Sequence, residues 1–366
     1  MTRLLALFAC CTALVACEVI EAPRPYARGD AEQIQVVTDS ATWQGPVGDA
    51  IRAELGRPVA TLPSNQGAFK LKLTELTSRS FPLLKASPHT VFVASVDAPG
   101  EIGDFIRSRV GEANLPALRS GQSAAVNVRP NLWADGQLVT IATAATDSAL
   151  ARQIVERGEE LRWAYGATAR ERTSSEMFTR LRQTDLEDEM MAAHGFSIGV
   201  QRDFVKVQDT TVTVAGRTGT FVRFRRVLVD TWRDFFVFAQ DGVSQRPPAP
   251  ELAALTDSLL ARFALGSFDG SYVQTDEQRP TTTDTTTIAG RPALERRGLW
   301  YMTNDVMGGA YISHAWHDPE ADRLYLYYGM TFAPDRTLDK RKFLRQMEAI
   351  PYTFQSRADL ARQSAD

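Results

Sequence analysis

The sequence predicts a two-domain α+β protein in which each domain is a mainly antiparallel sheet packed with helices. In the first half of the chain, single amphipathic helices alternate with strand patterns, an order typical of a small α+β domain. The second half changes character: runs of strand patterns are interrupted by one helix and closed by another. The 366 residues also exceed what one domain usually holds.

The N-terminus has the pattern of a secretory signal. Arg3 precedes an uncharged, mostly apolar run from Leu4 to Ala16 that ends in small residues. This run of 13 residues is shorter than the ~20 needed to cross a bilayer. We therefore expect residues 1–16 to be removed rather than kept as a membrane helix.

The end of this run resembles the lipobox of bacterial lipoproteins, with the residues Leu14-Val15-Ala16-Cys17. By that resemblance, Cys17 takes a diacylglyceryl group and a further acyl chain, such as palmitate, and becomes the first residue of the mature protein. Two or more acyl chains hold a protein stably on a membrane. The alternative is an ordinary secretory signal in which Cys17 is incidental.

Composition excludes several classes of function. All three cysteines, Cys10, Cys11 and Cys17, lie in the signal or at its end, so the mature chain has no thiol for catalysis, redox chemistry or zinc binding. The net charge of −3 lacks the basic excess expected of a nucleic-acid binder. Residues 17–30 show no apolar periodicity and predict a flexible tether that reaches roughly 40 Å when extended.

The N-terminal domain is predicted to cover residues 31–170. Phe69, Leu71 and Leu73 alternate with polar residues, as in a half-buried strand, whereas Thr90 to Val96 is more continuously apolar. The predicted strands are 34–37, 69–74, 90–96, 124–128 and 138–143, and the predicted helices are 48–55, 102–110 and a segment from 147 to 165.

A capping-box pattern marks the border between the domains. Thr173-Ser174-Ser175-Glu176 spaces a hydroxyl and a carboxylate to satisfy each other's backbone donors at a helix start. We expect that helix to end at Gly195 and the domain boundary to lie between Gly166 and Thr173. The C-terminal domain then covers 171–353, followed by a tail at 354–366.

The C-terminal domain is rich in strand patterns. In its last helix, Phe343, Met347 and Ile350 are expected to face the core, while Lys340, Arg341 and Arg345 face outward. Residues 281–287 are a threonine-rich patch that predicts a solvated loop or an edge strand. The predicted strands are 197–207, 220–229, 234–240, 293–302, 310–316 and 323–332, and the predicted helices are 252–263 and 338–350.

Motifs in the C-terminal third resemble one family closely: Gly270-Ser271-Tyr272, Glu295-x-Arg297-Gly298-Leu299-Trp300, Asn304-Asp305-x-Met307-Gly308-Gly309, Phe332-Ala333-Pro334 and Arg345 to Ile350. These motifs resemble the envelope lipoproteins grouped as domain of unknown function 4837. Trp43-x-Gly45-x-Val47-Gly48 and Asn131-x-Trp133-Ala134 extend the resemblance to nearly the whole mature chain. It implies a lipoprotein of the Gram-negative envelope, at the outer membrane, with no assigned activity. The second half is also similar to the PsbP-like α/β/α sandwich, which is a likeness of fold alone.

Two motifs are typical of catalytic or metal sites. Gly195-Phe196-Ser197-Ile198-Gly199 matches the serine-hydrolase elbow, but that elbow needs a strand before the serine and a helix after it. Here a helix enters and a strand leaves, so we interpret Gly195 as a helix end. His314 and His317 have metal-ligand spacing, yet on a strand an offset of three places them on opposite faces.

The remaining polar residues indicate no cofactor or metal. Asp185, Glu187, Asp188 and Glu189 form an acidic cluster that we place late in a helix and interpret as a solvated face, with paired catalytic carboxylates as the open alternative. His89 and His194 stand alone and are interpreted as surface or capping residues. No phosphate-binding loop and no dinucleotide glycine motif occurs in the sequence.

The best candidate for a binding surface is a loop between two strands. Asn-Asp and Gly-Gly are turn formers, so the loop residues follow a strand that carries an arginine and a tryptophan. The alternative is a structural role, in which these residues are required to form the hairpin turn and an Arg–Asp pair stabilises it. The candidate residues are Arg297, Trp300, Asn304, Asp305, Gly308 and Gly309.

These observations favour a non-catalytic envelope lipoprotein, anchored at Cys17, that binds an envelope protein or glycan. The rival is an envelope hydrolase that uses carboxylates or histidines near the Asn304 loop, and a deep pocket lined by two or more of Glu295, Asp305, His314 and His317 would favour it. A shallow aromatic surface around Trp300 would favour binding. A carrier of small solutes would need a large apolar cavity between the domains.

Overall fold

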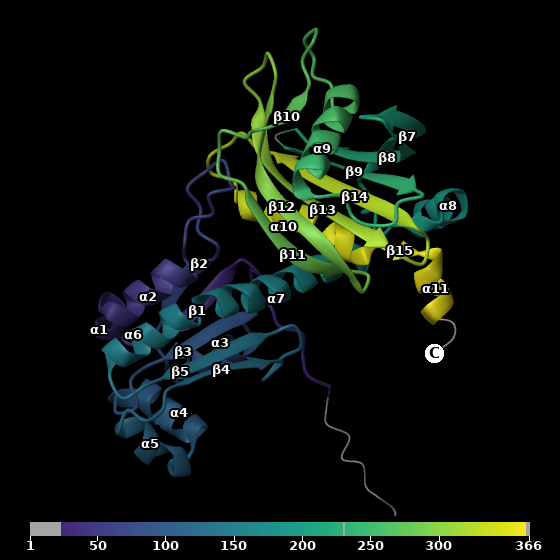
Figure 1. The fold of residues 1–366 in the computed structure, drawn as a ribbon. Helices are drawn as coiled ribbons and strands as arrows, with labels where there is room; N and C mark the ends of the chain where they lie inside the picture. Colours follow the sequence, from purple (N-terminus) through teal and green to yellow (C-terminus); the bar gives the residue numbers. More distant parts are fainter. Residues whose placement is uncertain (1–22, 230, 364–366) are drawn as a thin grey trace, which may run out of the picture.

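The computed structural model describes residues 23–229 and 231–363 (Figure 1). The predicted signal and Cys17 lie outside this part of the chain. The predicted α+β fold in two domains is confirmed, with 34% of residues in helices and 33% in strands. Within the two described ranges, no helix combines the length and the apolarity that crossing a membrane requires.

The N-terminal sheet has five strands in the order β2-β1-β3-β5-β4. Three of its four pairings are parallel, and only β4 and β5 pair antiparallel, so the expectation of a mainly antiparallel sheet is wrong here. The reason is that helices fill the connections between the parallel strands, which returns each strand in the same direction. The strands are β1 Gln33–Val37, β2 Lys70–Thr74, β3 His89–Val93, β4 Ala125–Pro130 and β5 Leu138–Thr143.

Helices cover this sheet and connect its strands. Apolar residues of two of the longer helices, such as Ile51 and Ile154, join the strand residues in one core. The other face of the sheet packs against Ile102 and Ile106. The helices are α1 Ser40–Gln44, α2 Pro46–Glu54, α3 Phe81–Ala86, α4 Gly100–Val110, α5 Leu115–Arg119 and α6 Asp147–Glu156, with a 3-10 turn, η1, at Glu112–Asn114.

The C-terminal sheet has eight antiparallel strands in the order β10-β12-β13-β14-β9-β8-β7, with β11 also paired to β12, so the predicted antiparallel sheet is confirmed here. β11, the threonine-rich patch, is an edge strand. The strands are β7 Val205–Val214, β8 Arg217–Val227, β9 Trp232–Asp241, β10 Val273–Thr275, β11 Thr282–Ile288, β12 Arg291–Met302, β13 Gly308–Asp318 and β14 Arg323–Phe332.

Both faces of the large sheet are buried under helices, which gives the α/β/α layers that the PsbP-like resemblance implied. Alternation along β14 divides the cores: Tyr325 and Tyr327 face one way, and Leu326 and Tyr328 face the other. Helix α9, Ala249–Phe263, covers the Tyr328 side. Helices α8, Thr184–His194, and α10, Lys340–Ala349, cover the Tyr325 side.

Helix α7, Gly158–Phe178, runs without interruption between the two domains (Figure 1). Its Leu161 and Tyr165 lie in the N-terminal core, and its Met177 and Phe178 lie in the C-terminal core. The capping box predicted to open a helix at Thr173 is therefore wrong, because Thr173 lies inside a continuous helix. The predicted end at Gly195 is confirmed, since Gly195 follows α8 in the left-handed conformation.

The polar face of α10 was assigned to solvent, and this was wrong. Lys340 and Arg341 are buried, and Arg345 is half-buried, because this face of α10 packs against α7 and the N-terminal domain. The opposite face carries Met347 and Ile350 into the C-terminal core, as predicted.

The two ends of the described chain are packed rather than loose. Residues 23–30 were expected to form part of a flexible tether, but Tyr26 pairs with Asp135, and Arg172 stacks on the Tyr26 ring. The backbone N–H of Ala27 donates to the Asp135 carbonyl at 2.9 Å. At the other end, the expected tail contains the short strand β15, Gln355–Ser356, paired to β6, Phe196–Ser197, and the helix α11, Arg357–Gln363.

His89, interpreted from sequence as a surface or capping residue, is completely buried at the start of β3. Its ring contacts Phe69 and Tyr165, with centroids 5.9 and 5.2 Å apart, and neither ring nitrogen has a hydrogen-bond partner among the described residues. Burial, together with the positive charges of Arg172 and Arg345, lowers the pKa of His89 to about 3. His89 is therefore neutral in the folded protein.

We predict that replacing His89 with Phe flattens the dependence of stability on pH. The folded pKa lies below the unfolded value of 6.5, so the unfolded chain binds the proton first and His89 removes stability as pH falls from about 6.5 toward 3. Between pH 8 and pH 5, His89→Phe should lose about 2 kcal/mol less free energy of unfolding than the wild type. Urea unfolding at the two pH values measures this difference, and equal losses in both proteins would contradict it.

Candidate functional site

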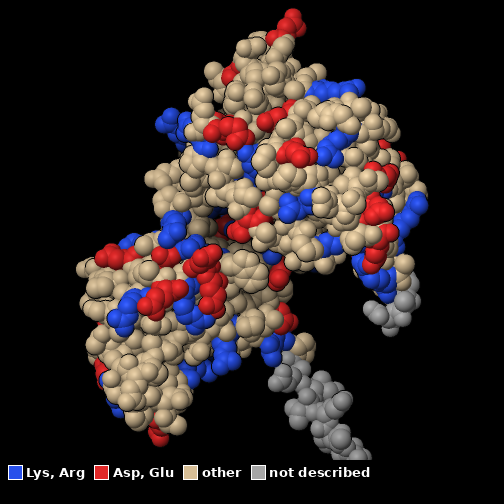
Figure 2. All heavy atoms as spheres, in the orientation of Figure 1, with Lys and Arg blue, Asp and Glu red and all other residues tan. Residues whose placement is uncertain are grey.

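A cleft of about 920 Å³ lies between the two domains. Figure 2 shows acidic and basic side chains gathered at the waist that separates the two lobes. The walls of the cleft come from one face of α7, from β11 and β12, from α10, and from the loop between α2 and β2. The polar residues that line it are Arg57, Glu159, Glu160, Arg162, Arg170, Asp284, Thr285, Thr286, Glu295, Arg297, Arg341, Arg345, Glu348 and Tyr352.

Small residues on α7 keep the cleft open. Trp163 and Arg170 lie seven residues apart on the same face of the helix, and Gly166 and Ala167 lie between them. A Cβ atom at Gly166 would meet only the Arg345 guanidinium, at 3.9 Å, so the position has room for a side chain. Trp163 is 73% exposed at this wall.

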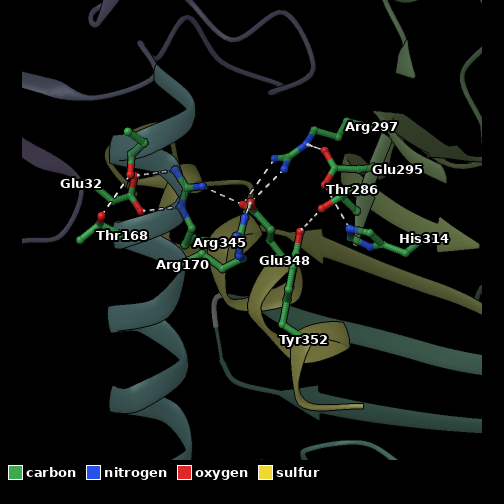
Figure 3. A network of polar contacts seen from close by, with 11 residues as sticks. Glu32, Thr168, Arg170, Thr286, Glu295, Arg297, His314, Arg345, Glu348 and Tyr352 are labelled. Carbon is green, nitrogen blue, oxygen red and sulfur yellow. Dashed lines mark hydrogen bonds and ion pairs between the residues drawn. The ribbon is translucent and has the colours of Figure 1, made fainter. Parts of the chain in front are cut away.

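A chain of ion pairs crosses from one domain to the other beside the cleft (Figure 3). Glu32, which precedes β1, accepts from Arg345 Nε at 3.0 Å, and Arg345 Nη1 in turn donates to Glu348 at 2.8 Å. Arg297 Nη2 lies 3.0 Å from the other oxygen of Glu348. We call the six residues Glu32, Arg170, Glu295, Arg297, Arg345 and Glu348 the interdomain network.

The network continues into the large sheet. Arg297 Nε donates to Glu295 at 2.5 Å, and the other Glu295 oxygen lies 3.0 Å from His314 Nε2 on the neighbouring strand. Arg170 of α7 reaches Glu348 at 3.4 Å, and its guanidinium carbon lies 3.9 Å from the centre of the Tyr352 ring. Figure 3 shows these side chains converging from α7, α10 and β12.

Both carboxylates of the large-sheet side are held ionised. Burial alone would raise the pKa of Glu348, but Arg297 and Arg345 outweigh it and lower that pKa to about 2. Burial acts in the same way on Glu295, where Arg297 and His314 lower the pKa well below its usual range. A carboxylate with such a pKa is a poor proton donor or acceptor near neutral pH. The network is therefore suited to holding structure and to hydrogen bonding.

The residues proposed as one binding surface lie on different faces of the sheet. Arg297 lines the cleft, whereas Trp300, three residues further along β12, faces α9 and is 1% exposed. The Trp300 ring Nε1 donates to the Thr331 carbonyl at 3.2 Å. Gly309 pairs opposite Trp300, and a Cβ there would lie 1.9 Å from the Thr331 carbonyl oxygen. Gly309 is thus required by packing.

The loop that carries Asn304 and Asp305 lies at the far end of the β12–β13 hairpin. Asn304 has a left-handed φ of 58°, Asp305 accepts from the backbone of Val306 at 2.6 Å, and Gly308 pairs with Tyr301. His314 lies six positions beyond Gly308 along the extended strand, a distance of about 20 Å. The turn is present as predicted, but Arg297 pairs with glutamates rather than bracing Asp305.

The motifs that resembled catalytic and metal sites have structural explanations. Ser197 follows a helix and lies in the short strand β6, the reverse of a nucleophile elbow. His314 and His317 face opposite sides of β13, as expected from their offset. In residues 23–229 and 231–363, no group of three or more His, Cys, Asp or Glu is arranged to hold a metal ion.

The acidic cluster was placed late in a helix, which is wrong. It occupies the first half of α8, where the helix dipole favours negative charge. Its member Glu187 is buried, accepts from Arg182 Nε at 2.9 and 2.8 Å, and accepts from the Val200 backbone at 3.1 Å. Glu187 is therefore a structural carboxylate.

Most residues of the cleft could not be identified from the sequence. Arg345 and Glu348 lie in a quoted motif, but Arg345 was interpreted as facing outward and Glu348 was given no role. Glu32, Trp163 and Arg170 carried no signal. A pattern of charged residues on α10 at positions 341, 345 and 348, on one side of the helix, would have indicated a charged interface.

Two known families match the chain, one on each side of the end of helix α7 at Phe178. Residues 183–353 match the family described as Domain of unknown function (DUF4837), which confirms that resemblance for the C-terminal domain. Residues 27–178 match a second family, Domain of unknown function (DUF8532). The motifs at Trp43 and Asn131 fall in this second match, so the expected extension of the first family over the N-terminal half is corrected. No curated protein matches the sequence.

We predict that Glu348→Gln destabilises the fold strongly. The substitution removes a buried carboxylate charge that pairs with three arginines of the interdomain network. Breaking a buried ion pair lowers the free energy of unfolding by about 3–5 kcal/mol. As a matched control, Asp97→Asn removes the exposed pair with Arg119 and should cost at most about 1 kcal/mol. Chemical unfolding at pH 7 measures both.

The same variant gives a test at low pH. The Glu348 pKa is lower in the folded chain than its ordinary value of 4.5, so its carboxylate contributes stability above pH 4.5 and loses it as pH falls toward 2. Glu348→Gln should show a smaller loss of stability between those pH values than the wild type. If the interdomain network contributed nothing to stability, the wild type and Glu348→Gln would have equal free energies of unfolding at pH 7.

Proposed function

Because the C-terminal domain matches a family of unknown function, we propose a role from the geometry of the cleft. The protein is a lipid-anchored lipoprotein of the Gram-negative envelope, tethered at Cys17, that binds another envelope component in the cleft between its domains. The observation that carries the proposal is the cleft itself, a concave space of about 920 Å³ bordered by Trp163 and by the polar side chains of two domains. Ligand sites occur preferentially at such domain interfaces.

Binding without chemistry agrees with the electrostatics. A general acid or base works best when its pKa lies near the working pH. Glu348 and Glu295 have pKa values lowered far from neutrality, and the Glu32, Arg297 and Arg345 side chains are committed to ion pairs. Such groups present fixed donors and acceptors to a ligand without exchanging protons with it.

The rival hydrolase finds less support. It needed two or more of Glu295, Asp305, His314 and His317 to line one pocket, but only Glu295 of these lines the cleft. Asp305 lies at the opposite end of its hairpin from the pair of Glu295 and His314. A small-solute carrier needs an apolar cavity between the domains, whereas this cleft is rich in ion pairs.

We predict that labelled palmitate is incorporated into the wild-type chain and is lost in Cys17→Ala, because only that thiol follows the lipobox pattern. Cys10→Ala, which changes the earlier cysteine of the signal, is the matched control and should retain the label. Metabolic labelling followed by immunoprecipitation measures both. Label that persists in Cys17→Ala would remove the anchor from the proposal.

We predict that Gly166→Met blocks the cleft while preserving the fold. Met is a better helix former than Gly by up to about 1 kcal/mol, and its side chain would fill the gap between Trp163 and Arg170. In affinity capture from solubilised envelopes, Gly166→Met should fail to retain a component that the wild type retains. The control Phe268→Ala changes an exposed ring away from the cleft and should still retain that component. Equal capture by all three proteins would place binding elsewhere.

A further inference from the structure

The charge balance of the cleft favours a ligand without net charge. Six arginines and five acidic residues line it, so the two signs nearly cancel. The arginines are already matched: Arg57 pairs with Glu54, Arg341 with Asp339, and the three of the interdomain network with Glu32, Glu295 and Glu348. Arg162 also contacts Glu54. An anionic ligand would have to displace the carboxylate partner of one of these arginines, whereas a neutral polar ligand would not.

The groups at the wall suit hydroxyl ligands. Guanidinium groups donate, carboxylates accept, and the Thr285 and Thr286 hydroxyls of β11 do both. A sugar hydroxyl is likewise both donor and acceptor, so it can bond to either member of an ion pair. Because the pairs hold each other in place, these donors and acceptors are preorganised before a ligand arrives.

Trp163 adds a flat apolar surface at the same wall. Its indole is 73% exposed, although aromatic side chains bury more of their area than most. Two turns along α7, about 10 Å, separate it from Arg170, and the small Gly166 and Ala167 leave that span open. A pyranose ring has an apolar face of C–H groups that stacks on an indole while its hydroxyls point to the side. The span accommodates a short run of such rings.

We infer that the interdomain cleft binds a neutral oligosaccharide, with Trp163 as the stacking platform and the arginine–glutamate pairs and β11 threonines as its hydrogen-bonding wall. The inference rests on the proposed function, because it names the chemical class of the envelope component. A volume of about 920 Å³ is at the upper end of ordinary ligand sites, which fits a chain of several rings rather than a single sugar.

The test is calorimetric titration of the full lipoprotein in a polyoxyethylene detergent, whose head group contains no sugar. The probes are chitotetraose and maltotetraose as neutral tetrasaccharides and tetragalacturonate as an acidic one. At least one neutral probe should bind with a Kd below about 10 mM and shift the tryptophan emission to the blue. Trp163→Ala should weaken that binding at least about tenfold, Trp163→Phe should retain part of it, and Phe268→Ala should leave it unchanged.

Two outcomes would overturn the inference: no binding of either neutral probe, or tighter binding of tetragalacturonate that weakens with salt. Thermal unfolding of Trp163→Ala shows whether a loss of binding reflects a loss of fold, which the exposure of this side chain makes unexpected. If the cleft-blocking variant Gly166→Met loses a captured envelope protein while no saccharide binds the wild type, the proposed function stands and the saccharide inference fails. If capture is also independent of the cleft, both fail.

Discussion

The arrangement of the two domains depends on neutralising charges that have been taken out of water. Glu348 is almost completely buried, and so is Glu32, and each would be costly there without a partner. Their partner Arg345 sits on α10 between them and connects a carboxylate of the N-terminal domain to one of the C-terminal domain. Because the charges match only when the domains are in register, the network specifies their relative position as well as stabilising it.

Helix α7 supplies the second constraint. A single uninterrupted helix that places Tyr165 in one core and Phe178 in the other leaves no loop at which the domains could rotate. Helix α10 completes the arrangement, since its apolar side packs on the large sheet and its charged side on α7. The cleft is what remains between these fixed elements. Its shape follows from small side chains on α7, and its polarity follows from the same arginines and glutamates that join the domains.

The sequence predicted the C-terminal domain better than the N-terminal one. Alternation along β14 and the apolar stripe of α9 identify these elements, and most strands of the large sheet pair with the next strand in the chain, although β14 also pairs with the distant β9. In the N-terminal domain, the same kind of pattern located the strands but not their parallel pairing, because periodicity reports burial and not the direction of a partner. The helix start expected at Thr173 failed because hydroxyl–carboxylate spacing also occurs inside helices.

The candidate site was the least predictable part. A buried arginine in an ion pair has the same sequence pattern as one in solvent, so Arg345 was assigned to the surface. His89 was misplaced for a similar reason, because its burial depends on Phe69 and Tyr165 from distant segments. The residues of the predicted surface around Trp300 do not lie together. Arg297 and Trp300 are three positions apart on one strand, and an odd offset places them on opposite faces of the sheet. No pattern in the sequence marked Trp163 or Arg170 as members of one wall.

The docking of Tyr26 against Asp135 has a consequence for the anchored protein that we propose. Because residues 23–30 pack against the body, only the five residues 18–22 lie between the lipidated cysteine and the packed chain, a linker that spans at most about 20 Å. So short a linker keeps the protein close to the lipid headgroups and restricts its rotation. The anchored protein would then contact only polymers that lie along the bilayer surface. It would not contact long strands farther from that surface.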